Sequence, residues 1–546
     1  MSKVIGIDFG TTNTVVAFMK DNKQIQIIID HDGKEIMPSV IAKKDGESTL
    51  VGESAKHNTQ AFVKGDGVKE IKREIGKGKK ILFNGRRMEA SDIAAIILAK
   101  AKGNAEIYFK EEVKDAVITV PAEFSDAQRK EIIEAAVKAG FNVKKILNEP
   151  TAALLAYTQN KFANKKVLCY DFGGGTFDVS IANIDSTGVE VIAVGGDREL
   201  GGKDIDETIK KLVINDLRSS KGKILDEYGN HQVSLAVEKA KIELTKNTFA
   251  AIAIQNLSTT TGSIPYYKKI TRGEFNNLIR FIINKTIKEV KNTLDSKNIL
   301  QSEIDEVILV GGSSKMPIVR ESLESLFGNK VVETNNMDML VAIGAAIEAG
   351  NIMGINKSSR SRIMTDVCPF SLGLKVYRDG NDDVFDPIVY KNSPYGKEFS
   401  QKYNTAFDRQ NSMVLEIYQG DSLCATENEH VTDFEITGIP ESSAGEEWVR
   451  ITFVYDENGI INIKAKILST GLEKVHKYKY GYDLNKKVDT TAVDDNIIST
   501  GIRITASEVK EQLEREGLGS IAGKLGNYMK YEQQEKVEDM LNDILN

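Results

Sequence analysis

Two stretches of the chain repeat one uncommon pattern: an apolar strand ends in Asp, turns through glycine, presents Thr and re-enters a strand. The first stretch contains Asp8-Phe9-Gly10-Thr11-Thr12, and the second contains Asp171-Phe172-Gly173-Gly174-Gly175-Thr176. The pattern predicts a β-hairpin, whereas a P-loop leads from its glycine turn into a helix and carries Gly-Lys-Ser/Thr. Two copies this far apart do not form a solenoid period. They predict two related lobes.

The other segments of residues 1–355 carry α/β signals. Ser125 and Gln128 form a capping box for a helix that Gly140 ends. Further segments expected to be regular are the strands Ala116–Val120 and Val143–Leu147, the helix that Pro150 opens, the helices near Leu235–Thr245 and Phe275–Leu294, and the small-residue helix Ala342–Ala346. An α/β domain is expected over this range.

A polar, Ser-rich segment predicts an interdomain linker at residues 356–366, and helix signals fade beyond it. The Asn458-Gly459 pair predicts a tight hairpin between two strands. We therefore expect an all-β region at residues 367–483, followed at residues 484–546 by a short segment that is helical and highly charged from about Ser507. The strand-like runs are Met413–Tyr418, Val449–Tyr455 and Ile460–Ile463.

The bulk composition narrows the location and the partners. Lys and Arg number 72 against 79 Asp and Glu, a net charge of −7, which argues against a general nucleic-acid binder. The three cysteines are far apart and imply no disulfide framework, as expected in a reducing compartment. No apolar run approaches the roughly 20 residues of a membrane span, and the first residues show no secretory signal. We expect a cytoplasmic protein that binds neither nucleic acid nor membrane.

The two glycine turns present backbone N–H groups and Thr hydroxyls, which together can hold a phosphate. Asp8 and Asp171 end the strands beside the turns, and carboxylates next to phosphates indicate a divalent cation such as Mg²⁺. The pairs Gly201-Gly202 and Gly311-Gly312 allow further close backbone approaches, although a plain strand-to-helix turn also accounts for the second pair. Together these elements predict that two lobes clamp a polyphosphate.

These residues resemble the seventy-kilodalton heat-shock chaperones of the DnaK type over about residues 3–350. The resemblance implies an actin-like, two-lobed α/β ATPase domain, a β-sandwich peptide-binding domain and a short α-helical C-terminal segment. It also implies ATP or ADP with Mg²⁺, and K⁺ as a candidate second ion. The matching motifs are Ile7–Asn13, Ile71–Arg73, Val117–Ala122, Asn148–Ala153, Asp171–Asp178, Glu238–Leu244 and Gly311–Pro317, with looser matches at Pro369–Gly373, Tyr418–Gly420 and Gly438–Pro440.

The resemblance also implies roles for individual residues. The residues expected at the hydrolytic centre are Lys72, Glu149, Asp171, Thr176, Asp178 and Asp8, with the metal and its waters held by Asp8, Glu149 and Asp171. The residues expected to bind the nucleotide are Gly10, Thr11, Thr12, Asn13, Gly173, Gly174, Gly175, Gly201, Gly202, Glu238, Lys241, Thr245, Gly311, Gly312, Ser313 and Lys315. Pro121 and Arg129 match a switch that reports the nucleotide state outward.

The expected roles of Lys72 and Lys315 each meet an objection from the sequence. Lys72, taken alone, would be a solvated surface lysine. Lys315 replaces an arginine that is common in the family, and lysine lacks the planar face that stacks on adenine, so a weaker or altered grip on the base is expected.

In the β-sandwich, the resemblance places a peptide groove at Leu374, Tyr377, Tyr403, Ala406, Met413 and Leu415. Alternate strand positions face one side and would line an apolar slot, while backbone hydrogen bonds hold an extended ligand. An ordinary sandwich core is the alternative for these positions. The linker Arg362–Asp366 is less apolar than the family's leucine-rich one, which predicts weaker interdomain coupling, and the chain departs from the family after about Leu484.

The expected function is an ATP-dependent chaperone that binds extended hydrophobic segments of unfolded proteins. A J-domain co-chaperone and a nucleotide exchange factor are expected partners by resemblance. A specialised, weakly coupled ATPase devoted to one client or assembly stays open as an alternative. A small-molecule kinase would need a catalytic Asp base and a substrate pocket, neither of which the sequence indicates clearly. An actin-like filament protein fits poorly with the long C-terminal addition.

Overall fold

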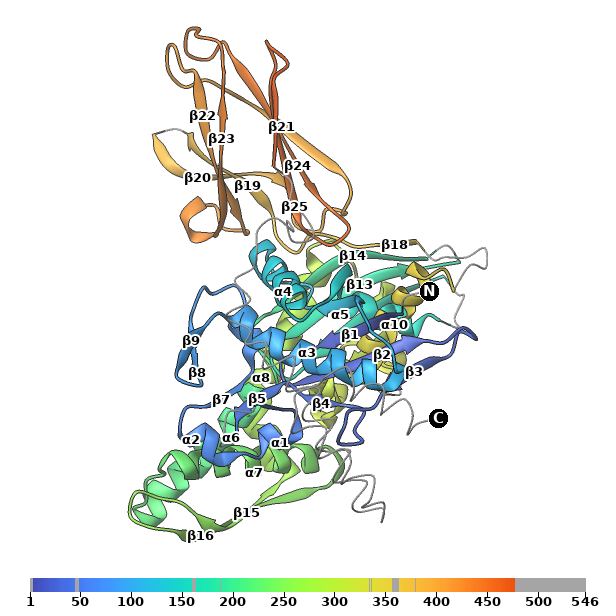
Figure 1. Ribbon diagram of the computed structural model, residues 1–546, viewed down its shortest axis with the longest axis vertical. Coiled ribbons are helices and arrows are strands. Elements are labelled where there is room, and N and C mark those ends of the chain that lie inside the picture. The colour runs from blue at the N-terminus through green and yellow to red at the C-terminus, as the bar shows by residue number, and fades with distance from the viewer. Residues whose placement is uncertain are drawn as a thin grey trace, which may run out of the picture. The chain divides into compact units, whose positions relative to one another are not determined.

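The fold is mixed α/β with several separate sheets (Figure 1). The computed structural model describes residues 3–44, 49–159, 164–186, 188–332, 334, 336–355, 363–378 and 380–476. The expected C-terminal helical segment and most of the linker lie outside the described residues. The elements that carry the site and the β-rich region belong to one compact unit, residues 1–42 and 50–482. None of the described helices is long and apolar enough to cross a membrane.

Two central sheets share one plan, which accounts for the repeated sequence pattern. In the first sheet, β1 forms a hairpin with β2 and pairs in parallel with β10. In the second, β12 forms a hairpin with β13 and pairs in parallel with β17. We call the parts of the chain built on these sheets the first half and the second half.

The strand orders are β11-β10-β1-β2-β3 in the first half and β17-β12-β13-β14-β18 in the second. The strands of the first half are β1 (Val4–Phe9), β2 (Asn13–Met19), β3 (Ile25–Ile28), β4 (Met37–Pro38), β10 (Asp115–Val120) and β11 (Asn142–Asn148). Those of the second half are β12 (Lys165–Phe172), β13 (Phe177–Ile184), β14 (Gly188–Asp197), β17 (Glu306–Val310) and β18 (Ile363–Thr365).

Helices α5 (Glu149–Tyr157) and α10 (Leu340–Ile352) share one hydrophobic cluster with both central sheets. A Cβ on Gly344 would lie 1.8 Å from the carbonyl oxygen of Ala152. Glycine therefore lets the two helices cross in direct backbone contact. The small-residue helix expected from the sequence is α10, and its small residues allow this close packing between the two halves.

Local signals predicted several helices correctly. Ser125 caps the N-terminus of helix α4 (Asp126–Lys138) and forms the expected capping box with Gln128. Gly140, just beyond the C-terminus of the helix, has a φ of +84°. The other helices are α1 (Glu53–Lys56), α2 (Thr59–Val63), α3 (Ala90–Phe109), α6 (Gly202–Lys221), α7 (Glu227–Lys246), α8 (Arg272–Asp295) and α9 (Pro317–Phe327). The small strands around them are β5 (Val40–Lys43), β6 (Thr49–Val51), β7 (Gly67–Lys69), β8 (Ile81–Phe83), β9 (Arg86–Met88), β15 (Phe249–Leu257) and β16 (Ile264–Thr271).

The β-rich region consists of two four-stranded sheets, β20-β19-β22-β23 and β21-β24-β25-β26. Alternate residues of both sheets fill one hydrophobic cluster, as period-2 patterning requires. Its strands are β19 (Leu372–Arg378), β20 (Asn381–Val389), β21 (Glu398–Asn404), β22 (Ser412–Gln419), β23 (Glu429–Thr437), β24 (Trp448–Tyr455), β25 (Ile461–Ile467) and β26 (Glu473–His476).

The hairpin expected between β24 and β25 is present, with one difference at Asn458. Only Gly459 has a positive φ, +73°, and the turn is closed from the Asp456 N–H to the Ile460 carbonyl at 3.0 Å. The Asn458 side chain instead accepts a hydrogen bond from the Ile146 N–H at 2.8 Å. A tertiary contact therefore holds the side chain of Asn458, while its backbone N–H donates locally to the Asp456 carboxylate at 3.0 Å.

The linker docks on the second half through its backbone. Strand β18 pairs in parallel with β14, in the register Val189 with Met364. Asp366 follows it and accepts hydrogen bonds from the Asn148 amide and the Thr151 hydroxyl, both at 2.7 Å. Backbone pairing does not require the leucines of the family's linker, so the more polar sequence of this chain still forms an edge strand.

Candidate active site

A cavity of about 290 Å³ lies where the two hairpin turns meet. It is lined by both turns, Gly10–Asn13 and Gly173–Thr176, and by the segment Gly311–Ser313. Gly202 lies behind the second turn, where its N–H donates to the Gly173 carbonyl at 3.0 Å. A Cβ on Gly201 would lie 2.6 Å from the backbone of Gly174. These two glycines therefore support the second turn from behind.

Three of the expected hydrolytic carboxylates, Asp8, Glu149 and Asp171, line the cavity. Burial raises the pKa of Asp8 to about 7, with a further contribution from the Glu149 charge. Burial and the Glu149 charge likewise hold the pKa of Asp171 well above its usual range. Such a concentration of buried carboxyl groups favours either bound protons or a cation.

Lys72 is the positive charge within this acidic group. It pairs with Glu149 and its side chain is 2% exposed. Its ammonium lies 5.8 Å from the centre of the Phe9 ring and 5.7 Å from that of Phe124. The interpretation of Lys72 as a solvated surface lysine is therefore wrong, because the three-residue helical turn Ile71–Arg73 directs its side chain into the protein.

The acidic group fits a divalent cation that keeps several of its waters. Among the described residues no three Asp, Glu, His or Cys side chains are arranged to ligate a metal directly. Mg²⁺ usually keeps several of its waters and takes one or two carboxylates together with substrate phosphates. Buried carboxyl groups with raised pKa values, facing a cavity lined by glycine turns, are consistent with that mode.

The cavity is also lined by the residues expected around the ribose and base. Glu238, Lys241, Thr245 and Lys315 all line it. Two acidic residues there were missed: Asp206, which pairs with Lys241 at 2.7 Å, and Asp338, which pairs with Lys315. Burial raises the pKa of Asp206 to about 6. Neither belongs to a motif of the sequence, because both are recognised only by the lysine with which they pair.

Asp178 follows the second turn, and hydrogen bonds connect it to residues on the side of the turn that faces away from the cavity. Its side chain is buried and accepts a hydrogen bond from the Ala122 N–H at 3.0 Å. The buried Arg129 donates to the Ala122 carbonyl at 3.1 Å and to the Asn458 carbonyl of the β24–β25 hairpin at 3.3 Å. Pro121 precedes Ala122 and is also buried. A continuous set of contacts therefore joins the second turn to the β-rich region.

The residues expected in the peptide groove are divided between core and surface. Leu374 and Leu415 are buried in the core between the two sheets, and Met413 packs against that core. Tyr403 donates its hydroxyl to Asp386 at 2.8 Å. Tyr377 is 75% exposed, and Ala406 is exposed. Sequence reasoning also missed two exposed apolar side chains of this region, Phe407 and Val414.

The fold and the site define a protein whose two similar α/β halves meet at a cavity lined by glycine turns and acidic residues, with a β-rich region that contacts both halves. The family model described as Hsp70 protein matches residues 4–82 and 78–543. The chain belongs to the Hsp70 family.

Curated relatives cover most of the chain. A chaperone protein DnaK of Thermosipho melanesiensis is 34% identical over 558 residues, covering 99% of this chain and 92% of the relative. Those of Thermosipho africanus and Thermotoga petrophila are 37% and 36% identical, each over 86% of this chain and 79% of the relative.

Family membership confirms the resemblance inferred from the sequence. It also confirms the predictions that this chain binds nucleotide, is an ATPase and acts as an ATP-dependent chaperone. The specialised ATPase and the small-molecule kinase are not favoured.

Proposed function

We propose that this chain binds extended hydrophobic segments of unfolded proteins in the β-rich region and changes its grip on them by hydrolysing ATP. In this proposal residues 1–355 form an actin-like ATPase domain, residues 356–366 a linker, residues 367–483 a β-sandwich peptide-binding domain and residues 484–546 a short helical segment. The contacts from Asp178 through Ala122 and Arg129 to Asn458 support it, because they join the phosphate side of the cavity to the β-rich region.

The chemistry proposed for the cavity is in-line attack of water on the γ-phosphate. The turns Gly10–Asn13 and Gly173–Thr176 orient the phosphates, and Thr176 is placed at the γ-phosphate. Lys72 offsets the negative charge that develops there, while Glu149 and Asp8 position water. Mg²⁺, when bound, neutralises the phosphate charge and is held through Asp8, Glu149 and Asp171; K⁺ is proposed as a second ion.

The base side of the cavity binds the ribose and adenine through Glu238, Lys241, Thr245 and Lys315. Lys315 pairs with Asp338, so base binding competes with this ion pair. We expect weaker adenine binding than an arginine would give. The switch residues Pro121 and Arg129 pass the state of the second turn to the β-rich region.

The partners proposed are unfolded or extended peptide segments, a J-domain co-chaperone and a nucleotide exchange factor, in the cytoplasm. The proposed groove comprises Leu374, Tyr377, Tyr403, Ala406, Met413 and Leu415. The buried positions of Leu374 and Leu415 imply that the groove opens when the β-rich region changes conformation. The exposed Tyr377 would lie at its rim, since tyrosine favours a partly wet site.

The test is the release of a fluorescent hydrophobic peptide from the purified full-length chain, with ATP–Mg²⁺ or ADP–Mg²⁺. We expect release to be at least about tenfold faster with ATP, which corresponds to a coupling of about 1.4 kcal/mol. Lys72→Ala serves as the control, and it should bind ATP and release the peptide quickly without hydrolysing the nucleotide. Equal release rates with both nucleotides would remove the proposed peptide switch while leaving the ATPase in place.

A further inference from the structure

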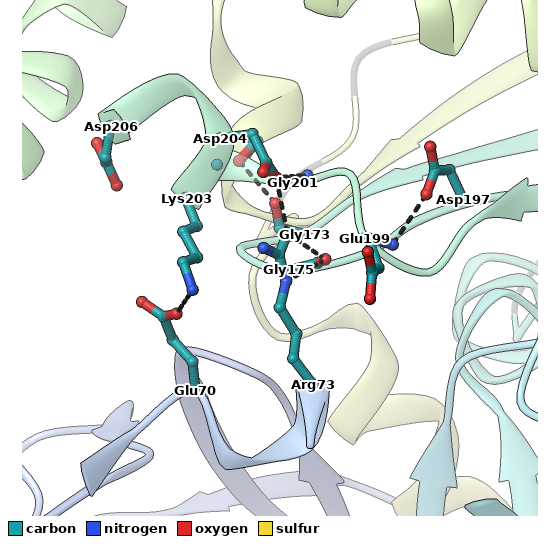
Figure 2. A network of polar contacts seen from close by, with 12 residues as sticks. Glu70, Arg73, Gly173, Gly175, Asp197, Glu199, Gly201, Lys203, Asp204 and Asp206 are labelled. Atoms are coloured by element: carbon teal, nitrogen blue, oxygen red, sulfur yellow. Dashed lines mark hydrogen bonds and ion pairs between the residues drawn. The ribbon is translucent and has the colours of Figure 1, made fainter. Parts of the chain in front are cut away.

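Arg73 follows Lys72 in the short helical turn of the first half, yet its side chain ends on the second half. Its Nε and Nη2 atoms donate to the Gly175 carbonyl at 3.0 Å and 2.7 Å. Nη2 also donates to the Asp204 carboxylate at 2.7 Å. Figure 2 shows Arg73 reaching from the segment that carries Glu70 to the glycine turn and the start of α6. Arg73 therefore crosses between the halves next to the cavity.

The three glycine carbonyls of the second turn are all held from behind. The Gly173 carbonyl accepts from the Gly202 N–H, and the Gly174 carbonyl accepts from the Lys203 N–H at 2.9 Å. The Gly175 carbonyl accepts from Arg73. In a trans peptide the N–H points opposite to the carbonyl before it. Holding the three carbonyls therefore directs the N–H groups of the next residues away from their supports.

Arg73 differs from the other two supports in its origin. Gly202 and Lys203 begin helix α6 of the same half as the turn, so their bonds do not depend on the position of the first half. The bond from Arg73 fixes the peptide plane that carries the N–H of Thr176, a residue that lines the cavity. Of the three described hydrogen bonds that hold these carbonyls, only the one from Arg73 depends on contact between the halves.

We propose that Arg73 is a positioning residue, which aims the Thr176 N–H at the γ-phosphate only when the two halves are closed. The proposal rests on the proposed placement of the γ-phosphate at Thr176. It makes the rate of hydrolysis, more than the affinity for nucleotide, depend on the approach of the halves. Hydrolysis should depend on Arg73 more than ADP binding does, because ADP has no phosphate at the position toward which the Thr176 N–H points in this proposal.

A second ion pair crosses the same gap and provides a matched control. Glu70, three residues before Arg73, pairs with the Lys203 side chain (Figure 2). Glu70→Gln removes this cross-half ion pair without removing a bond to a turn carbonyl. Arg73→Lys keeps a positive charge beside Asp204, but one ammonium does not reproduce the two parallel N–H bonds of the guanidinium.

The experiment measures single-turnover hydrolysis of prebound ATP and, separately, ADP affinity by calorimetry, using the full-length chain. We expect hydrolysis to fall about tenfold in Arg73→Lys and about 30-fold or more in Arg73→Ala, because a misaimed donor loses transition-state stabilisation. ADP affinity should change less than about threefold in both variants, since ADP lacks the γ-phosphate. Glu70→Gln should hydrolyse ATP at nearly the wild-type rate.

Two results would overturn the proposal: wild-type hydrolysis in Arg73→Lys, or an equal loss in Glu70→Gln, which would assign the effect to closure of the halves in general. Lys72→Ala tests the proposed site separately. If Lys72→Ala hydrolyses ATP normally, the proposed role of Lys72 fails, and the comparison of Arg73→Lys with Glu70→Gln still decides the role of Arg73.

Discussion

The two glycine turns are similar in sequence, but they are held differently. Each is closed by a bond from its first glycine N–H to a carbonyl three residues on: Gly10 to Asn13 at 2.9 Å and Gly173 to Thr176 at 3.1 Å. The Gly10 carbonyl accepts from the Ser39 hydroxyl of the same half at 2.8 Å. The second turn needs Arg73 of the other half to hold its last carbonyl.

The glycines of the second turn also make room for the first turn. A Cβ on Gly175 would lie 2.4 Å from Cγ2 of Thr11, and a Cβ on Gly174 would lie 2.4 Å from the Thr12 side chain. The first turn is thus held by a residue of its own half, while the second turn is held by a residue of the other half as well. This difference is the basis for the proposed role of Arg73 in the second turn.

The largest effect is expected for Gly175→Ala, whose Cβ meets the Thr11 side chain and separates the turns. ATP turnover should fall about 100-fold, since a displacement near 1 Å costs that much in a positioned reaction. Gly173→Ala is the control, because its Cβ would have its nearest neighbour, the Thr176 carbonyl, at 3.5 Å. Equal turnover in the two variants, measured by phosphate release, would contradict the close contact of the turns.

An intermediate effect concerns Glu123, on the outward side of the second turn. Glu123 is buried and faces Lys391 at 3.6 Å, with Arg198 and Glu289 also near. Burial raises its pKa from 4.5 to about 7, more than Lys391 and Arg198 lower it. The folded state therefore prefers the neutral carboxyl. Its stabilising contribution is complete below about pH 4.5 and is lost as the pH rises through about 7.

Glu123→Gln stays neutral at every pH and should remove this part of the pH dependence. The unfolding free energy of the variant relative to wild type should increase between pH 5 and pH 8 by up to about 3 kcal/mol. Denaturant unfolding at both pH values measures it, with the exposed Glu473→Gln as control. An identical pH dependence in Glu123→Gln and wild type would show that Glu123 ionises freely.

The smallest effect is expected for Ser39→Ala in the first turn. The variant loses the bond to the Gly10 carbonyl and the 2.9 Å contact with the Thr14 hydroxyl. Unfolding free energy should fall by about 1 kcal/mol, and ATP turnover should change less than about fivefold, because the hairpin pairing of β1 with β2 remains. A loss as large as that of Arg73→Ala would show that both turns depend equally on outside support.

Local structure was predictable where neighbouring residues suffice. The two hairpins, the Ser125 cap and the end of α4 at Gly140 depend on contacts within a few residues. The two glycine turns belong to this group, because Asp, Gly and Thr carry the turn and its donors in one short segment.

Long-range partners were not predictable from their own segments. Lys72 is buried because Glu149 and two aromatic rings surround it. Arg73 received no role of its own, since the carbonyl that it holds lies about a hundred positions later. The linker pairs as a strand despite its polar sequence, because backbone groups of β14 offer the same hydrogen bonds to any side chain.

The sequence by itself determined that the chain carries two similar glycine turns, the family that its motifs resemble and most of the residues that line the cavity. The tertiary structure decided which half supports which turn and which charges are buried. The physical reason is that a turn is specified by local backbone geometry, whereas desolvation and cross-half hydrogen bonds depend on residues brought together only by folding.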